Sequence, residues 1–267
     1  MQIRNLFPLL AVSLSTSPVL IAKPEANFYL VQNTTTNVGA SPALEALSVL
    51  KGQGIILDDD NPQEGALFLI DYTHSANNGT PVSTVIRQSD KAGNILVVEE
   101  TLYNAQGEFS SYTIEQNQLD ARGSVEKIGN SVRLIWKDSN NSKISSETSG
   151  DNLVTSGSLL AYMNSYINDL RLGKNLEVNM AIPERGACYS FDILPQITSK
   201  KPTASDLGVS ISLSNFFLRK IVSPIKMSFQ NSPEGYRPLS IVAPAAVRKK
   251  VGHSLERFTA RIEYPRQ

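Results

Sequence analysis

Apolar and polar residues alternate along most of this chain, which is the pattern of β-strands that bury one face. The alternation is strict through residues 176–182 and again through 189–193, and these two segments predict a hairpin. Segments separated by turns that contain Gly or Asn predict further strands at 65–72, 82–88, 95–103, 109–115, 132–136, 143–147, 225–229, 239–241 and 258–264. The nearly continuous apolar run at 65–72 favours a central strand, and the polar 143–147 an edge strand.

One segment changes to helical spacing, and it directly precedes the hairpin. Between Ser158 and Leu172, apolar residues recur every three or four positions. Ser158 is expected to cap this helix, and Gly173 to end it. The stripe that packs on the sheet is expected to consist of Leu159, Met163, Tyr166 and Leu170.

Two shorter helices are predicted on either side of this region. Leu44, Leu47 and Leu50 lie along one side of a helix at 41–50. Ser214 is expected to cap a helix at 215–222, which Pro224 prevents from continuing.

These elements predict a mainly β protein. We expect a curved antiparallel sheet, or open half-barrel, with one longer helix and one or two short helices packed on it. Residues 41–267 are expected to form a single domain, since the polar loop at 196–204 is too weak a boundary to divide them.

The N-terminus is expected to be an export signal. Arg4 precedes an apolar run from Leu6 to Ile21 that is too short to span a bilayer. We expect a signal peptide at 1–22, with cleavage after Ala22 or Ala26, and a flexible lead-in at 23–40. The alternative is that the run forms a buried first strand. Cys188 is the only cysteine, so no intrachain disulfide exists, which suits a bacterial periplasm.

Composition is that of a globular protein, with 41% hydrophobic and 19% charged residues. The charge is unevenly distributed: residues 23–195 contain 12 basic and 21 acidic side chains, whereas residues 196–267 contain 12 and 4. Opposite charges on neighbouring strands explain this asymmetry most simply. The alternative is a basic face for an anionic partner such as phospholipid head groups.

Few residues offer catalytic chemistry. His74 and His253 are expected to be solvated turn residues, and Asp58–Asn61 a solvated turn. Cys188 lies on the polar side of its strand, and a reactive thiol there needs a basic neighbour that lowers its pKa. Glu99 and Glu100 point to opposite faces of one strand and cannot act as a carboxylate pair.

No motif in the sequence indicates a metal, a cofactor or a nucleic acid. Zinc-ligand spacing, calcium-loop spacing and phosphate-binding glycine loops are all missing. The aromatic residues are dispersed, without the interleaved basic residues of a nucleic-acid platform. We therefore expect no metal, no cofactor and no nucleic-acid partner.

Two stretches carry a resemblance to a known family. The first comprises Gly157–Leu160, Asp169–Gly173 and Leu176–Val178, and the second Asn215–Lys220, Pro224–Phe229 and Arg237–Leu239. Together they are similar to the DUF3108 family of uncharacterised bacterial exported proteins. The resemblance implies a signal peptide and an open antiparallel β-structure with a helix before a strand, and it carries over no catalytic residues. A further likeness, to half-barrel lipoprotein carriers, is at the level of the fold alone.

We expect a non-catalytic periplasmic protein that binds a lipid or other apolar small molecule in the groove of its sheet. The alternative is an envelope assembly or scaffolding factor that binds another protein through a sheet edge. A hydrolase is the least favoured interpretation. The residues expected to bind an apolar ligand are Met180, Phe191 and Ile262, with Arg219, Lys220 and Lys226 near an anionic head group.

Overall fold

The structure is a computed structural model that describes residues 29–32, 47–139, 142–148, 152–196, 206–232 and 235–265. The predicted signal peptide lies outside these residues, together with both cleavage positions. Within the expected lead-in at 23–40, the structure describes only β1 (Tyr29–Gln32), which pairs with Ser48–Lys51.

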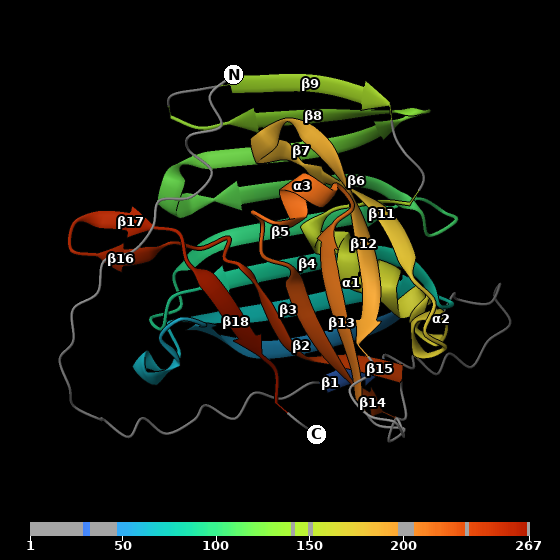
Figure 1. Ribbon diagram of the computed structural model, residues 1–267, viewed down its shortest axis with the longest axis horizontal. Helices are drawn as coiled ribbons and strands as arrows, with labels where there is room; N and C mark the ends of the chain where they lie inside the picture. Colours follow the sequence, from blue (N-terminus) through green and yellow to red (C-terminus); the bar gives the residue numbers. More distant parts are fainter. Residues whose placement is uncertain are drawn as a thin grey trace, which may run out of the picture.

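Most of the described chain belongs to one sheet of 16 strands (Figure 1). Fifteen follow one another in the order β10-β11-β12-β13-β14-β15-β18-β2-β3-β4-β5-β6-β7-β8-β9, and β1 pairs with β2 beside this path. Their bounds are β2 (Leu47–Asp58), β3 (Phe68–Asn77), β4 (Thr80–Ser89), β5 (Ile95–Tyr103), β6 (Phe109–Gln116), β7 (Ala121–Ile128), β8 (Ser131–Lys137), β9 (Ser142–Thr148), β10 (Leu153–Val154), β11 (Leu176–Ile182), β12 (Ala187–Gln196), β13 (Asp206–Leu213), β14 (Ile225–Ser232), β15 (Gly235–Pro244) and β18 (Thr259–Glu263). A separate hairpin joins β16 (Lys249–Val251) to β17 (Ser254–Glu256).

The sheet consists of two antiparallel meanders joined in the middle. Each strand from β2 to β9 pairs with the next in sequence, and so does each strand from β11 to β15. β18 joins the two meanders because it pairs with β15 on one side and with β2 on the other. Among the described strand pairs, only β10 and β11 run parallel. The prediction of a mainly β, antiparallel and open sheet is confirmed.

The sheet curves until its far end meets the turn between β11 and β12. Three hydrogen bonds join β9 to this turn and to the start of β12, and the turn contains the 3-10 helix η3 (Pro183–Arg185). Lys143 Nζ donates to the Glu184 carbonyl (3.3 Å), Ser145 Oγ donates to the Gly186 carbonyl (2.8 Å), and the Cys188 N–H donates to Glu147 Oε2 (2.8 Å). Side chains of the edge strand β9 therefore engage the β11–β12 turn.

The longest helix, α1 (Ser156–Ser165), lies between the two meanders (Figure 1). It contacts β4, β5 and β10, while Leu159, Leu160 and Met163 share an apolar cluster with side chains from β11 to β14. Two further α-helices are described, α2 (Ile167–Arg171) and α3 (Phe216–Arg219), besides short 3-10 helices. No helix among the described residues is both long and apolar enough to cross a lipid bilayer.

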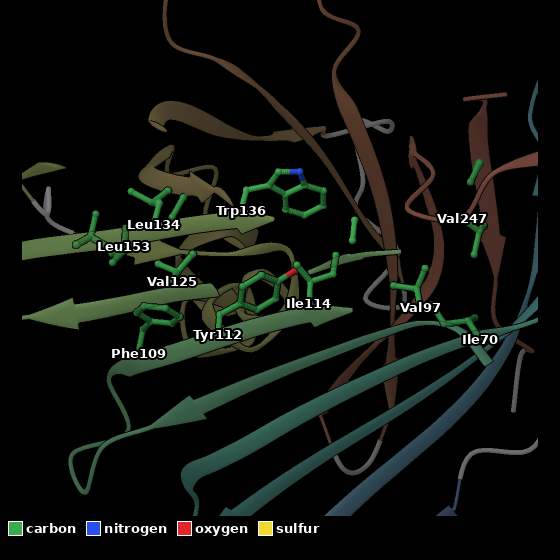
Figure 2. Packing of buried hydrophobic residues seen from close by; sticks show 14 of the residues in the cluster. Ile70, Val97, Phe109, Tyr112, Ile114, Val125, Leu134, Trp136, Leu153 and Val247 are labelled. Carbon is green, nitrogen blue, oxygen red and sulfur yellow. The ribbon is translucent and has the colours of Figure 1, made fainter. Parts of the chain in front are cut away.

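Buried side chains form two clusters. The first follows β5 to β8 and includes Tyr112, Val125, Leu134 and Trp136, which lie along one face of the sheet in Figure 2. The second surrounds α1 and includes Met163, completely buried, together with side chains of β11 to β14. The interior is therefore occupied by side chains both in the β5–β8 region and around α1.

The predicted helices differ from those in the structure. The helix predicted at 41–50 is wrong over Leu47–Leu50, which begin β2, and residues 41–46 lie outside the described residues. Pairing with β1 and β3 provides backbone partners along this segment, and Gly52 and Gly54 disfavour a helix there. The helix predicted at 215–222 is shorter, since only Phe216–Arg219 are α-helical, and its cap is Asn215 rather than Ser214.

The helix predicted at 158–172 is broken at Tyr166 into α1 and α2. Its cap is Thr155, and the Thr155 N–H donates to Ser158 Oγ (2.8 Å), so Ser158 is the third helical residue of a capping box. The break leaves Tyr166 38% exposed, whereas Leu159, Met163 and Leu170 are buried as predicted.

Candidate functional site

A cavity of about 300 Å³ lies between α1, β10 and the ends of β5 and β6. Tyr103, Gly107, Glu108 and Phe109 line it from the β5–β6 hairpin, with Pro81 and Lys127 beside them. The opposite wall consists of Asn152, Leu153 and Val154 of the β10 segment and Ser158, Ala161, Tyr162, Ser165 and Tyr166 of α1 and its end. The cavity therefore uses the flank of α1 that faces away from β11 to β14.

Aromatic rings and hydroxyl groups share the lining of this cavity. The rings of Tyr162 and Tyr166 lie 4.8 Å apart, centroid to centroid. Burial, together with the neighbouring Tyr166, raises the pKa of Tyr162 to about 12, so its phenol stays protonated at neutral pH. Lys127 and Glu108 are exposed and bring charges of both signs to the edge of the cavity.

A buried carboxyl group lies beneath the first turn of α1. Glu99 of β5 is almost completely buried, and its Oε2 accepts hydrogen bonds from Tyr112 Oη (2.9 Å) and Ser156 Oγ (2.5 Å). Burial raises the pKa of Glu99, and the two donors counteract only part of that effect. Glu100 is exposed, so the prediction that the two carboxyl groups point to opposite faces is confirmed.

We expect Glu99 to make the protein less stable as the pH rises. Its ordinary pKa of 4.5 is raised in the folded state, so the unfolded chain loses this proton first. The stabilisation is complete below pH 4.5 and is lost as the pH rises through the raised pKa. Glu99→Gln removes this titration but keeps an oxygen acceptor. Chemical denaturation at several pH values should show wild type losing stability relative to Glu99→Gln as the pH rises above 4.5. Parallel curves would show that the pKa of Glu99 is not raised in the folded state.

A second polar network reaches the cavity from β3. His74 Nδ1 lies 2.9 Å from Thr84 Oγ1, which lies 3.2 Å from the hydroxyl of Tyr103. The prediction that His74 is a solvated turn residue is wrong, because it lies within β3 and its inward side chain is partly covered. Burial lowers its pKa, so the imidazole is neutral at neutral pH. His253 lies exposed between β16 and β17, as predicted.

Thr101 lies between these two networks on the inward face of β5. Its hydroxyl is buried and has no hydrogen-bond partner among the described residues. A Cβ atom on Gly157 would lie only 2.5 Å from that hydroxyl. Glycine at position 157 therefore lets the first turn of α1 lie directly on β5, which places Ser156 within reach of Glu99.

The residues predicted to bind an apolar ligand lie elsewhere. Met180 and Phe191 are buried in the apolar cluster around α1, and the partly buried Ile262 packs against the other cluster. Arg219 and Lys220 lie on and just after α3, and Lys226 is exposed on β14. None of the six lines the cavity beside α1. Their role in binding stays a prediction.

No protein-family model matches the chain, and no curated protein does. Among solved structures, the chain is similar to the crystal structure of a β-barrel-like protein of DUF1849, a domain of unknown function, from Brucella abortus. The two share 9% sequence identity over 80% of this chain and 94% of that chain, with a TM-score of 0.40. This distant likeness assigns the chain to no family.

Two further candidates from the sequence, Cys188 and Asp58, are half-buried and buried, respectively. Burial and the neighbouring Glu147 raise the pKa of the Cys188 thiol to about 12, which keeps it protonated and unreactive. Asp58, expected in a solvated turn, is buried because it ends β2 and pairs with Lys249 (2.8 Å). No group of three metal-ligating side chains occurs among the residues that the structure describes.

The sequence contains one signal for a buried carboxyl group, the pair Glu99 and Glu100. Two consecutive glutamates within a strand must point to opposite faces, so one of them faces the interior if the strand is covered. A buried carboxyl needs hydrogen-bond donors, and these come from Tyr112 and from Ser156, 13 and 57 positions away. The identity of those donors depends on the fold and has no local sequence signal.

Proposed function

We propose that the protein is a non-catalytic binding protein that holds a small amphipathic molecule in the cavity beside α1. The observation that carries this proposal is the lining: four aromatic rings, from Tyr103, Phe109, Tyr162 and Tyr166, surround a space that hydroxyl and amide groups also reach. A volume of about 300 Å³ is at the lower limit for small-molecule sites. A ligand the size of one sugar ring, with an apolar face and several hydroxyl groups, suits it.

This site differs from the lipid groove expected at the hairpin. Phe191 and Phe229 are buried side chains of the cluster around α1, and Trp136 belongs to the other cluster. Inward positions filled by large rings leave little room for an acyl chain at Met180 and Phe191. The alternative of a protein partner at a sheet edge concerns other groups, because Lys143 and Ser145 of β9 bond to the β11–β12 turn through their side chains.

We also propose that the protein is not an enzyme, and this rests on the surroundings of two possible nucleophiles, the Cys188 thiol and the Ser156 hydroxyl. The thiol of Cys188 has a raised pKa, and the hydroxyl of Ser156 donates to a carboxyl group rather than to an imidazole. Neither group has an imidazole among its partners in the described part of the chain. Export to the periplasm by residues 1–22 and kinship with the DUF3108 family also remain proposals, based on the N-terminal sequence and the two similar stretches.

Binding should depend on the aromatic lining of the cavity. Tyr162→Ala removes one ring of the Tyr162–Tyr166 pair and should weaken binding of a fitting methyl glycoside about three- to tenfold, the effect expected of one aromatic contact. Isothermal titration with a panel of methyl glycosides measures this affinity. Phe217→Ala is the matched control because it removes an exposed ring that does not line the cavity.

Native mass spectrometry of the protein purified from its own host provides a separate test. The mass of the chain shows whether residues 1–22 have been removed, and the mass difference on release of a ligand identifies its class. A bound acyl lipid whose retention is the same in Tyr162→Ala would contradict the proposed site. Equal glycoside affinities of wild type and Tyr162→Ala would contradict it as well.

A further inference from the structure

The short helix α3 and the turn after it present large apolar side chains to solvent. Phe216 is 63% exposed, Phe217 74% and Ile221 55%. Leu218 and Val222 point the other way and pack against the apolar cluster around α1. The inward residues are enough to anchor α3, so the folded chain gains little from the three outward ones.

Positive charge accompanies these exposed side chains. Lys220 Nζ lies 4.4 Å from the centroid of the Phe216 ring, and Lys226 is exposed a few residues later. From Ser214 to Lys226 the chain has three basic residues and no acidic one. The exposed residues Phe216, Phe217, Lys220, Ile221 and Lys226 all belong to the segment from α3 to the start of β14 and are termed here the α3 patch, which is both apolar and cationic.

The backbone beneath the α3 patch is held in place. The side chain of Asn215 accepts hydrogen bonds from the N–H groups of Phe217 (3.0 Å) and Leu218 (3.2 Å). Arg219 donates to the Leu213 carbonyl (2.8 Å) and forms an ion pair with Asp192. These contacts hold the backbone of α3 in place, so docking would not have to order the helix first.

We propose that the α3 patch docks the protein on an anionic phospholipid surface. Phe216, Phe217 and Ile221 enter the boundary between head groups and acyl chains, and Lys220 and Lys226 meet the phosphates. The charge argues for this partner over a second copy of the chain, because two such patches facing each other would bring like charges together. The α3 patch is separate from the cavity beside α1, so this proposal does not depend on the proposed ligand.

Co-sedimentation with vesicles tests the proposal. The mature chain should bind vesicles of phosphatidylcholine and phosphatidylglycerol in equal parts, and should bind phosphatidylcholine alone weakly. Lys220→Gln and Lys226→Gln should each lower binding to the anionic vesicles about fivefold. Replacing both Phe216 and Phe217 by Ser should lower it by about tenfold or more, since apolar burial supplies the rest of the affinity.

Two variants outside the α3 patch serve as matched controls. Ile128→Ser removes an apolar side chain that is 57% exposed, close to the value of Ile221, and Lys137→Gln removes an exposed lysine. Neither should change vesicle binding, and thermal unfolding should be unchanged in every variant. Failure of wild type to bind, equal binding to both kinds of vesicle, or an equal loss in the controls would each overturn the proposal. A shift from dimer to monomer in the Phe variants, with vesicle binding intact, would overturn it in favour of self-association.

Discussion

Met163→Asp is expected to destabilise the protein by about 3 kcal/mol or more, a large share of the roughly 5–15 kcal/mol that stabilises an ordinary protein. Met163 is completely buried on α1, in the cluster that joins this helix to β11, β12, β13 and β14. The described residues of this cluster are apolar and offer an aspartate no basic partner. Burying an unpaired charge is among the largest costs of a single substitution. Equilibrium unfolding in urea measures the loss.

Two control variants separate the charge from the position. Met163→Leu keeps the volume and should cost less than about 1.5 kcal/mol. Tyr166→Asp places the same carboxylate at the end of α1, where the side chain is 38% exposed, and should cost much less than the variant at 163. A loss below about 1 kcal/mol for Met163→Asp would contradict the packing of α1 described above.

Gly54→Ala is expected to cost about 3 kcal/mol, at the upper end of the usual range for overpacking. A Cβ at this position would lie 2.7 Å from the carbonyl oxygen of Glu263 and 3.0 Å from Cδ1 of Tyr264. The first of these neighbours is backbone, at the end of β18, so β2 and β18 have to move apart to accommodate a methyl group. Thermal and urea unfolding report the cost.

Gly208→Ala is the matched control. Gly208 is also a strand glycine, but a Cβ there would approach no neighbour closer than 3.4 Å, an ordinary contact distance. We expect a change within about 0.5 kcal/mol at this position. Similar losses at positions 54 and 208 would show that the contact between β2 and β18 is not the cause, because the reduced freedom of the unfolded chain favours the alanine variant at both positions.

The sequence was informative where neighbouring strands are also neighbours in the chain. Alternation and the glycine-bearing turns predicted Ile95–Tyr103 with its observed bounds, and both strands of the β11–β12 hairpin. The same approach missed Ala121–Ile128, where glycine and polar residues interrupt the apolar pattern. It also missed Asp206–Leu213, although Leu207, Val209, Ile211 and Leu213 alternate there with glycine and serine. The assignment of Ala121–Ile128 depends on hydrogen bonds to strands on both sides, which local pattern does not encode, whereas the alternation at 207–213 is itself the pattern of a strand.

The candidate site was harder to predict because distant segments build it. The cavity combines Pro81, residues 103–109, Lys127 and residues 152–166, and no spacing in the sequence relates these segments. His74 shows the same limit, since a histidine flanked by polar residues on a strand has the same pattern whether its face is covered or open. The inward face of β3 to β5 carries the polar residues His74, Thr84 and Glu99, and the sequence does not show that α1 covers this face.

The position of β18 also determines the order in which the chain can fold. The strands from β2 to β9, and those from β11 to β15, can pair soon after synthesis because each partner is adjacent in the chain. β18 pairs with β2, although the two strands are about 200 positions apart in the chain. Arg261, for example, bonds to Asp59, 202 positions earlier. Closing so long a loop is slow, so the middle of the finished sheet forms last. Until β18 pairs with β2, each of these two strands keeps an open edge toward the other. Self-association through such edges competes with folding at this stage.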